Sequence, residues 1–265
     1  MEARAIERRK YPYSAKTAYR LARYATKSYD SEPVIRADCG RRFYAFFKGE
    51  SRSRFRIKLA ATEGFIIRYR HRGGTYMVLA FRGTESLFSE PADWLTNLNT
   101  GLEIPQWLPA TGDEPPKAHR GFLRAYETVR PTVLAAVEDI KPNRIHITGH
   151  SLGGALATLA ALDIKTKYPD IRVTMYSFGS PRVGDAAFAS LYDRTVRDSH
   201  RVVHEGDRVP EQLPDLFAHV DGQHTLERHP DTRYPHHDRK YYLEQLDEEA
   251  GWPRIRQSYC APVPE

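Results

Sequence analysis

The chain has 265 residues, of which 40% are hydrophobic and 28% are charged, with a formal net charge of +6. This composition is typical of globular proteins and excludes disordered and fibrous chains. The two cysteines, Cys39 and Cys260, are too few for a disulfide-dense scaffold or a multi-cysteine metal site.

Positive charge is concentrated near the beginning of the chain. Residues 1–72 hold 19 Lys or Arg and 7 Asp or Glu, a net charge of +12. Four of these cations alternate with uncharged residues: Arg52, Arg54, Arg56 and Lys58. A strand would present all four on one face, which we interpret as the solvated side of an edge strand. Because no nucleic-acid-binding motif accompanies them, we expect no nucleic-acid partner.

The first ten residues are too charged for a secretory signal, and no apolar run approaches the roughly 18 residues of a membrane span. We therefore expect a soluble, cytoplasmic protein, with secretion by a signal-independent route or from a trimmed chain as the alternative. Nothing places Cys39 and Cys260 in an oxidising compartment, so we expect two free thiols ahead of a single bridge.

The first third of the chain predicts one helix followed by strands. Apolar residues at helical spacing cover 13–29, and strand-like runs follow at 43–47, 65–69 and 75–81. The last two runs flank a glycine-containing turn at 71–74, which predicts an antiparallel hairpin.

Strands and helices alternate from residue 121 onward. The predicted helices are 121–137, 151–168 and 238–248, and the predicted strands are 144–148, 172–178 and 200–204. This alternation favours a mostly parallel sheet with helices on both faces, to which the earlier hairpin adds an antiparallel edge. We expect a single α/β domain over residues 1–265.

Residues 149–153, Gly-His-Ser-Leu-Gly, match the pattern G-x-S-x-G. They follow a β-branched run and open an alanine- and leucine-rich helix, which is the setting of a nucleophile elbow. Ser151 would adopt a strained backbone there, and Gly149 and Gly153 would avoid steric clashes. The pattern predicts that Ser151 is a nucleophile; a capping serine in a glycine-rich turn is the alternative.

A serine nucleophile needs a base and an acid that orients the base. In hydrolases with a nucleophile elbow, both residues follow the serine in the chain. Asp207 lies in the turn beyond the predicted strand 200–204 and is our candidate acid. Glu205, Asp193 and Asp198 are the nearby alternatives.

Five histidines after Asp207 are candidates for the base: His219, His224, His229, His236 and His237. Their spacing does not fit a metal-binding helix motif, so we expect no metal ion. His236 and His237 directly precede the predicted helix 238–248, on a loop beside a fixed element.

These motifs together resemble the class 3 lipases, an α/β-hydrolase family that includes the fungal triacylglycerol lipases. The resemblance runs from about residue 13 to 246 and is carried by these segments: 78–84, 93–95, 119–122, 149–154, 177–184 and 201–210. It implies an α/β-hydrolase fold with a mostly parallel central sheet, helices on both faces and a helical lid.

The resemblance also implies roles for single residues. The family's base is followed by an aromatic residue five positions later and a leucine four positions after that, which fits His237 better than His236. Thr84 matches the residue whose backbone N–H and hydroxyl donate to the oxyanion. Leu152 matches the second donor, through its backbone N–H.

The segment 86–98 matches the family's lid. Its residues for lid function and substrate access are Leu87, Phe88, Trp94, Leu95 and Leu98. An amphipathic helix here would cover the acyl pocket and expose apolar surface on opening. A helix fixed on the core is the alternative.

The resemblance implies a serine carboxylic-ester hydrolase, a lipase that cleaves acylglycerols through Ser151, His237 and Asp207. The expected partner is a lipid or ester substrate, at an oil–water or membrane interface. We expect a monomer that needs no metal and no organic cofactor. A phospholipase or feruloyl-type esterase on the same scaffold stays open, as does a catalytically silent lipid-binding module.

Overall fold

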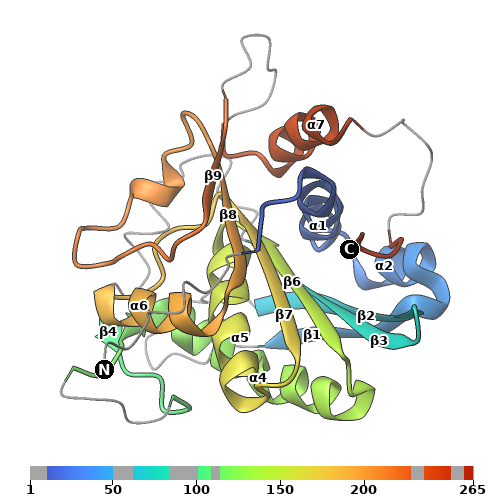
Figure 1. The fold of residues 1–265 in the computed structure, drawn as a ribbon, viewed down its shortest axis with the longest axis horizontal. Coiled ribbons are helices and arrows are strands. Elements are labelled where there is room, and N and C mark those ends of the chain that lie inside the picture. Colours follow the sequence, from blue (N-terminus) through green and yellow to red (C-terminus); the bar gives the residue numbers. More distant parts are fainter. Residues whose placement is uncertain are drawn as a thin grey trace, which may run out of the picture.

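The computed structural model describes residues 11–49, 62–83, 101–108, 114–227, 236–251 and 260–264. A seven-stranded sheet runs through the centre of the molecule, with the strand order β1-β2-β3-β6-β7-β8-β9 (Figure 1). Its strands are β1 (Phe43–Gly49), β2 (Thr62–His71), β3 (Gly74–Phe81), β6 (Arg144–His150), β7 (Arg172–Phe178), β8 (Asp198–His204) and β9 (Gln223–Leu226). The short strands β4 (Leu102–Glu103) and β5 (Ala118–His119) pair separately.

The sheet is mixed, as the sequence predicts. Strands β1, β2 and β3 pair antiparallel, and the β2–β3 hairpin turns at residues 71–74. From β3 to β9 each neighbouring pair is parallel. The carboxyl ends of β3, β6, β7 and β8 therefore share one edge of the sheet.

Helices cover both faces of the sheet. They are α1 (Ala15–Lys27), α2 (Glu32–Cys39), α4 (Arg120–Ile140), α5 (Leu152–Lys167), α6 (Ala186–Thr195) and α7 (Arg239–Ala250), with single turns η1 (Gly40–Arg42) and η3 (Val209–Glu211). In β3, Met77 and Leu79 join the core beneath α4, α5 and α6. The alternating residues Val78 and Ala80 join the second core, beneath α1, α2 and α7.

The helices and strands predicted from the sequence are confirmed, with ends shifted by a few residues. The short elements α2, α6 and β9 were not predicted because each has too few residues to establish a periodic pattern. The predicted cationic strand around residues 52–58 lies outside the described residues. None of the described helices is long and apolar enough to span a bilayer.

A disulfide joins Cys39, at the end of α2, to Cys260 in the carboxyl-terminal segment. Their Cα atoms lie 4.9 Å apart although 221 residues separate them in sequence. The expectation of two free thiols is therefore wrong. It was based on the cell compartment, whereas bridging depends on whether folding brings the two backbones within reach.

Helices α1 and α7 lie side by side although they come from opposite ends of the chain (Figure 1). The Tyr13 hydroxyl, just before α1, donates to Glu249 Oε2 on α7 at 3.0 Å. The two ends of the chain thus form one helical layer. The loop at residues 236–238 leads into α7, and its Asp238 side chain caps this helix by accepting from the backbone N–H of Lys240.

Candidate active site

Three turns at the carboxyl edge of the sheet surround the predicted nucleophile and acid. Ser151 follows β6, Gly179 follows β7, and Asp207 lies three residues after β8. The backbone N–H of Ser151 donates to Phe178 O at 2.9 Å, and that of Gly179 donates to Val202 O at 3.0 Å. These bonds extend the register of neighbouring strands into the turns.

Ser151 occupies a sharp turn between β6 and α5 and has φ = +58°, in the left-handed region. Such a backbone is costly for a residue with a side chain and is found at functional sites. The turn depends on its glycines. A Cβ at Gly149 would lie 2.1 Å from Gly153 O, and a Cβ at Gly153 would lie 2.4 Å from Phe81 O. Both positions therefore exclude larger residues.

Asp207 and His237 form a close pair. His237 Nδ1 lies 2.8 Å from Asp207 Oδ2 and 3.0 Å from Oδ1. Since an ionised carboxylate only accepts hydrogen bonds, Nδ1 carries the proton, and Nε2 of the neutral ring keeps its lone pair. This tautomer suits a general base that works through Nε2.

Two further groups hold the Asp207 carboxylate in place. The Tyr242 hydroxyl on α7 donates to Oδ2 at 2.6 Å, and the backbone N–H of Val209 donates to Oδ1 at 2.9 Å. Tyr242 also accepts from the backbone N–H of His204 at 2.9 Å. Burial, followed by the charge of Asp207, raises the pKa of Tyr242 well above its usual value, so the phenol stays a donor.

Ser151 Oγ and His237 Nε2 are both buried, and neither makes a hydrogen bond to another described residue. The His237 ring lies beside the nucleophile turn, with its centroid 4.7 Å from that of His150. The Ser151 hydroxyl and the Nε2 acceptor of His237 thus lie beside the same turn, and both are available to a bound reactant. The arrangement can supply a nucleophile and a base to a bound reactant.

The backbone around Gly179 is fitted closely to this pair. Gly179 has φ = +56°, and a Cβ there would lie 2.7 Å from Asp207 Oδ2 and 3.1 Å from His237 Cε1. In the sequence, Gly179 lies within a matching segment and Tyr242 is the aromatic residue five positions after His237, but neither position indicates a contact. Their partners come from separate turns, so no local pattern indicated them.

The other candidate histidines have other contacts. His219 Nε2 lies 3.0 Å from Pro210 O, and His224 Nε2 lies 3.1 Å from Glu249 Oε1. His236 stacks on His204, with ring centroids 5.5 Å apart, and lies over Gly206. His229 lies outside the described residues.

The alternative acids are also engaged elsewhere or exposed. Asp193 accepts from the backbone N–H of Asp221 at 2.9 Å, and Asp198 accepts from the Thr174 hydroxyl at 2.6 Å. Glu205 is exposed. Among the described candidates, Asp207 and His237 are the acid and histidine that meet beside Ser151.

Of the two expected oxyanion donors, Leu152 lies within the described residues and Thr84 does not. Leu152 begins α5, so its backbone N–H is among those without a partner inside the helix. Thr84 lies outside the described residues, as do the lid segment and its residues Leu87, Phe88, Trp94, Leu95 and Leu98. Gly83, next to Thr84, lies at the carboxyl edge of the sheet just beyond β3.

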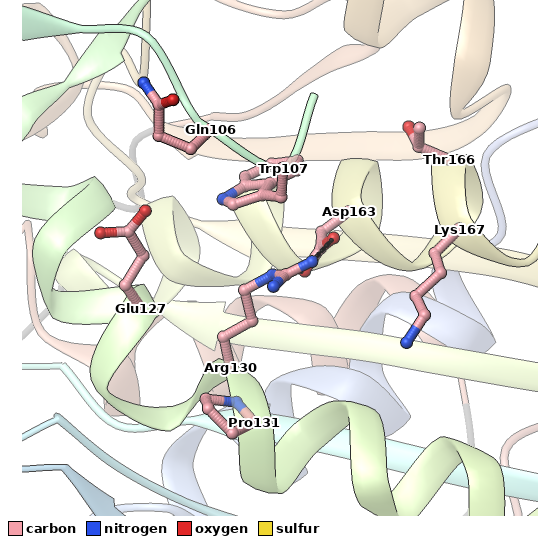
Figure 2. A pocket seen from close by; sticks show the side chains of 8 residues that line it. All are labelled: Gln106, Trp107, Glu127, Arg130, Pro131, Asp163, Thr166 and Lys167. Carbon is pink, nitrogen blue, oxygen red and sulfur yellow. Dashed lines mark hydrogen bonds and ion pairs between the residues drawn. The ribbon is translucent and has the colours of Figure 1, made fainter. Parts of the chain in front are cut away.

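A pocket of about 550 Å3 lies on α4 and α5, away from these residues, and is lined by Gln106, Trp107, Glu127, Arg130, Pro131, Asp163, Thr166 and Lys167 (Figure 2). Figure 2 shows the Arg130 guanidinium directed at Asp163, and its two hydrogen bonds measure 2.7 and 3.0 Å. The Tyr126 hydroxyl donates to the same carboxylate at 2.7 Å. Because this buried acid is neutralised and fully paired, the pocket is not a candidate catalytic centre.

In the described segments, no group of three or more His, Cys, Asp or Glu side chains is arranged to hold a metal ion.

The family described as Lipase (class 3) matches residues 78–217, which is more than half of the chain. The chain belongs to the class 3 lipase family. The resemblance inferred from the sequence is thereby confirmed.

Solved lipase structures share the fold of this chain. Lipase II from Rhizopus niveus matches with a TM-score of 0.62 at 25% identity, over 80% of each chain. The expected α/β-hydrolase fold, with a mostly parallel sheet between helical layers, is confirmed.

Two curated relatives are similar over about half of this chain. The secreted mono- and diacylglycerol lipase 1 of Fusarium solani is 34% identical over 148 residues, covering 54% of this chain and 41% of that protein. A chloroplastic phospholipase A(1) of Arabidopsis thaliana is 34% identical over 149 residues, covering 50% of this chain and 32% of that protein. The alignments thus span less than half the length of either relative.

The expected cytoplasmic location is wrong, because the Fusarium relative is named a secreted enzyme. The expectation rested on the charged first ten residues and on the lack of a long apolar run in the sequence, and neither feature shows which environment the folded chain tolerates. The buried Cys39–Cys260 disulfide is of the kind that persists in oxidising surroundings.

Proposed function

We propose that this class 3 lipase is a serine carboxylic-ester hydrolase that cleaves acylglycerols. The observation that carries the proposal is the Asp207–His237 pair, with Nδ1 and Oδ2 2.8 Å apart, beside a serine with φ = +58°. A strained serine and an oriented imidazole at one turn are the arrangement that acyl transfer requires.

In the proposed mechanism, Ser151 Oγ attacks the ester carbonyl while His237 Nε2 takes the hydroxyl proton. Asp207 holds the ring and stabilises the imidazolium that forms. The imidazolium then gives its proton to the departing alcohol and leaves an acyl-enzyme. Water then attacks the acyl group while His237 Nε2 takes its proton. The imidazolium returns the proton to Ser151 Oγ, so that the fatty acid is released and Ser151 is restored.

We propose that the tetrahedral oxyanion accepts hydrogen bonds from the backbone of Leu152 and from Thr84. The position of Leu152 supports this assignment, since the amino end of a helix has N–H groups without a partner inside the helix and its dipole favours negative charge there. Each such donor lowers the barrier by about 3–4 kcal/mol.

We propose a single catalytic domain over residues 1–265 with a lid at about 86–98, acting as a monomer without metal or organic cofactor. An extracellular site of action is supported by the name of the Fusarium relative and by the disulfide. The substrate would be met at an oil–water or membrane interface.

The serine is tested by Ser151→Ala. We expect a folded protein whose ester hydrolysis falls by roughly 10³-fold or more, because substrate still binds but the covalent path is lost. An active-site-directed fluorophosphonate should label the wild-type protein at Ser151 and leave the variant unlabelled. Retained turnover or labelling in the purified variant would place the nucleophile elsewhere.

The substrate class is tested with emulsified diacylglycerol, triacylglycerol and phosphatidylcholine. We expect release of fatty acid from the acylglycerols, as the name of the Fusarium relative supports. Preferential hydrolysis of phosphatidylcholine would favour a phospholipase, the activity for which the Arabidopsis relative is named. No labelling of Ser151, together with no hydrolysis of these esters, would leave a lipid-binding module.

The lid proposal is tested by replacing Trp94 and Leu95 with serine. The burial of each apolar side chain contributes about 1.5–3 kcal/mol, so losing two would shift the balance between closed and open lids. We expect unchanged hydrolysis of soluble p-nitrophenyl butyrate and slower hydrolysis of emulsified trioleoylglycerol. Equal losses on both substrates would indicate fixed structure.

A further inference from the structure

A chain of hydrogen bonds connects the segments that carry the proposed active site. The Tyr29 hydroxyl, two residues after α1, lies 3.0 Å from His150 Nδ1. His150 Nε2 lies 2.8 Å from the backbone oxygen of His237. The backbone N–H of Gly83, just beyond β3, donates to the Tyr29 hydroxyl oxygen. The chain thus joins the end of β3, the nucleophile turn and the base loop.

The partners determine the direction of each bond. A carbonyl oxygen only accepts, so His150 carries its proton on Nε2 and donates it to His237 O. Nδ1 is then an acceptor for the Tyr29 hydroxyl proton. Since both ring nitrogens are occupied, His150 has no free position from which to take a proton from its neighbour Ser151.

Tyr29 is fitted closely between the segments it connects. A Cβ at Gly83 would lie 2.2 Å from Tyr29 Oη and 2.6 Å from His150 O. The Arg239 guanidinium, two residues after His237, lies over the Tyr29 ring, 4.0 Å from its centroid. Tyr29 therefore contacts the base-bearing segment by a cation–π interaction as well as through His150.

His150 remains neutral beside the proposed base. Burial lowers the pKa of His150 well below its usual value, and the nearby His237 and Arg239 add to this effect. The two imidazole rings lie 4.7 Å apart, so a charged His150 would repel the imidazolium that forms on His237. A neutral His150 can support the base without opposing its protonation.

We infer that His150 and Tyr29 are positioning residues that hold the backbone of His237, and with it the catalytic imidazole, in register with Ser151 and the end of β3. This inference rests on the proposed function of Ser151 and His237. Neither residue touches the reacting atoms. The Nε2–H of His150 donates a hydrogen bond to the backbone oxygen of His237. The Tyr29 hydroxyl holds the His150 ring and fixes its tautomer by donating to Nδ1.

Three substitutions of His150 separate its two hydrogen bonds. In His150→Gln the amide nitrogen can reach the position of Nε2 and still donate to His237 O. In His150→Asn the shorter amide oxygen can take the place of Nδ1 and accept from Tyr29, but it cannot reach the base loop. His150→Leu removes both bonds. Tyr29→Phe removes only the hydroxyl.

We expect His150→Leu to lower kcat for p-nitrophenyl butyrate by roughly ten- to a hundredfold with little change in KM, the loss that follows from a slightly misplaced catalytic group. His150→Gln should recover most of this loss, and His150→Asn should recover little. Tyr29→Phe should lower kcat by roughly tenfold, and adding it to His150→Leu should cost little more, because both act through one chain.

Matched controls show whether burial alone explains the result. Tyr192→Phe removes the hydroxyl of another buried tyrosine, on α6, which lies 2.9 Å from Ser199 Oγ and has no hydrogen bond to the described residues of the proposed site. His146→Gln removes another buried imidazole of β6. Both controls should keep the wild-type kcat. If Gln and Asn at position 150 behave alike, or if the controls lose as much kcat as the variants, the inference is wrong.

Fluorophosphonate labelling separates this inference from the proposed function. If wild-type Ser151 does not react, the proposed function fails whatever the His150 variants do. If Ser151 reacts and the His150 and Tyr29 variants are labelled at the wild-type rate, only the positioning role fails. Slower labelling of Leu and Asn variants that keep the wild-type Tm would support it.

Discussion

At the scale of single residues, the candidate site depends on a carboxylate that is oriented from three sides. Asp207 accepts from His237, from the Tyr242 hydroxyl and from the backbone of Val209. A rigidly held carboxylate fixes the histidine tautomer, and charge-assisted hydrogen bonds of this kind are stronger than neutral ones. The Tyr242 hydroxyl is the member that can be removed with the smallest structural change.

We predict that Tyr242→Phe lowers both stability and kcat. The loss leaves the buried N–H of His204 without its acceptor and Asp207 with one donor fewer, which should cost about 1–3 kcal/mol in the free energy of unfolding. Urea denaturation and esterase kinetics measure the two effects. The control is Tyr126→Phe, which loses an equivalent bond to buried Asp163 and should lower stability alone. Unchanged kcat in Tyr242→Phe would show that the other two contacts suffice to orient Asp207.

At the scale of elements, turns and helix ends determine the geometry. The first turn of α4 is capped by His119, whose Nδ1 accepts from the backbone N–H groups of Gly121 and Phe122 at 3.1 and 3.3 Å. The ring is fully buried and stacks on Phe122 at 4.1 Å. Capping requires a neutral ring, because a protonated Nδ1 cannot accept.

This cap predicts a pH dependence of stability. Burial lowers the pKa of His119 from 6.5 to about 4 in the folded protein. Between these values an unfolded chain takes up a proton that the folded chain does not. The stabilisation that neutral His119 contributes is therefore complete above its pKa in the unfolded chain, 6.5. It is lost as the pH falls toward its pKa in the folded protein, by about 3 kcal/mol in all.

The comparison variant is His119→Asn, which keeps a capping acceptor but does not titrate. Urea denaturation at pH 7 and at pH 4 gives the free energy of unfolding of both proteins. We expect the wild-type protein to lose about 3 kcal/mol more than the variant over this interval. A constant difference between the two proteins would mean that His119 is protonated in the folded state.

At the scale of the whole molecule, the disulfide ties the first helical segments to the end of the chain. Cys39 and Cys260 are both buried in the core beneath α1, α2 and α7. The carboxyl-terminal segment also contacts α1 directly, because the Tyr24 hydroxyl donates to Ala261 O at 2.7 Å. The layer that carries the base loop is thus closed by a covalent link.

We predict that removing this link destabilises the entire fold. Replacing both cysteines with serine should lower the free energy of unfolding by about 2–5 kcal/mol, since a bridge across a long loop restricts the unfolded chain. Calorimetry with and without dithiothreitol gives the measurement. The reductant should lower the Tm of the wild-type protein toward that of the double variant and leave the variant unchanged. Insensitivity of the wild-type Tm to reduction at high temperature would contradict the prediction.

The sequence by itself determined the alternation of strands and helices, the mixed sheet, the family and the glycine-flanked serine turn. These features follow from local rules. Apolar periodicity determines the type of an element, and the two glycines beside Ser151 admit a turn that few other residues allow. Once the type and order of the elements are known, the pairing of neighbouring strands largely follows.

Only the tertiary structure decided which distant side chains meet. His236 and His237 are adjacent in the chain, yet one stacks on His204 and the other pairs with Asp207. The Cys39–Cys260 bridge and the link from Tyr29 through His150 likewise join segments that no local pattern relates. The physical reason is that periodicity specifies which face of an element is buried, whereas a contact at 3 Å depends on how whole layers settle against each other.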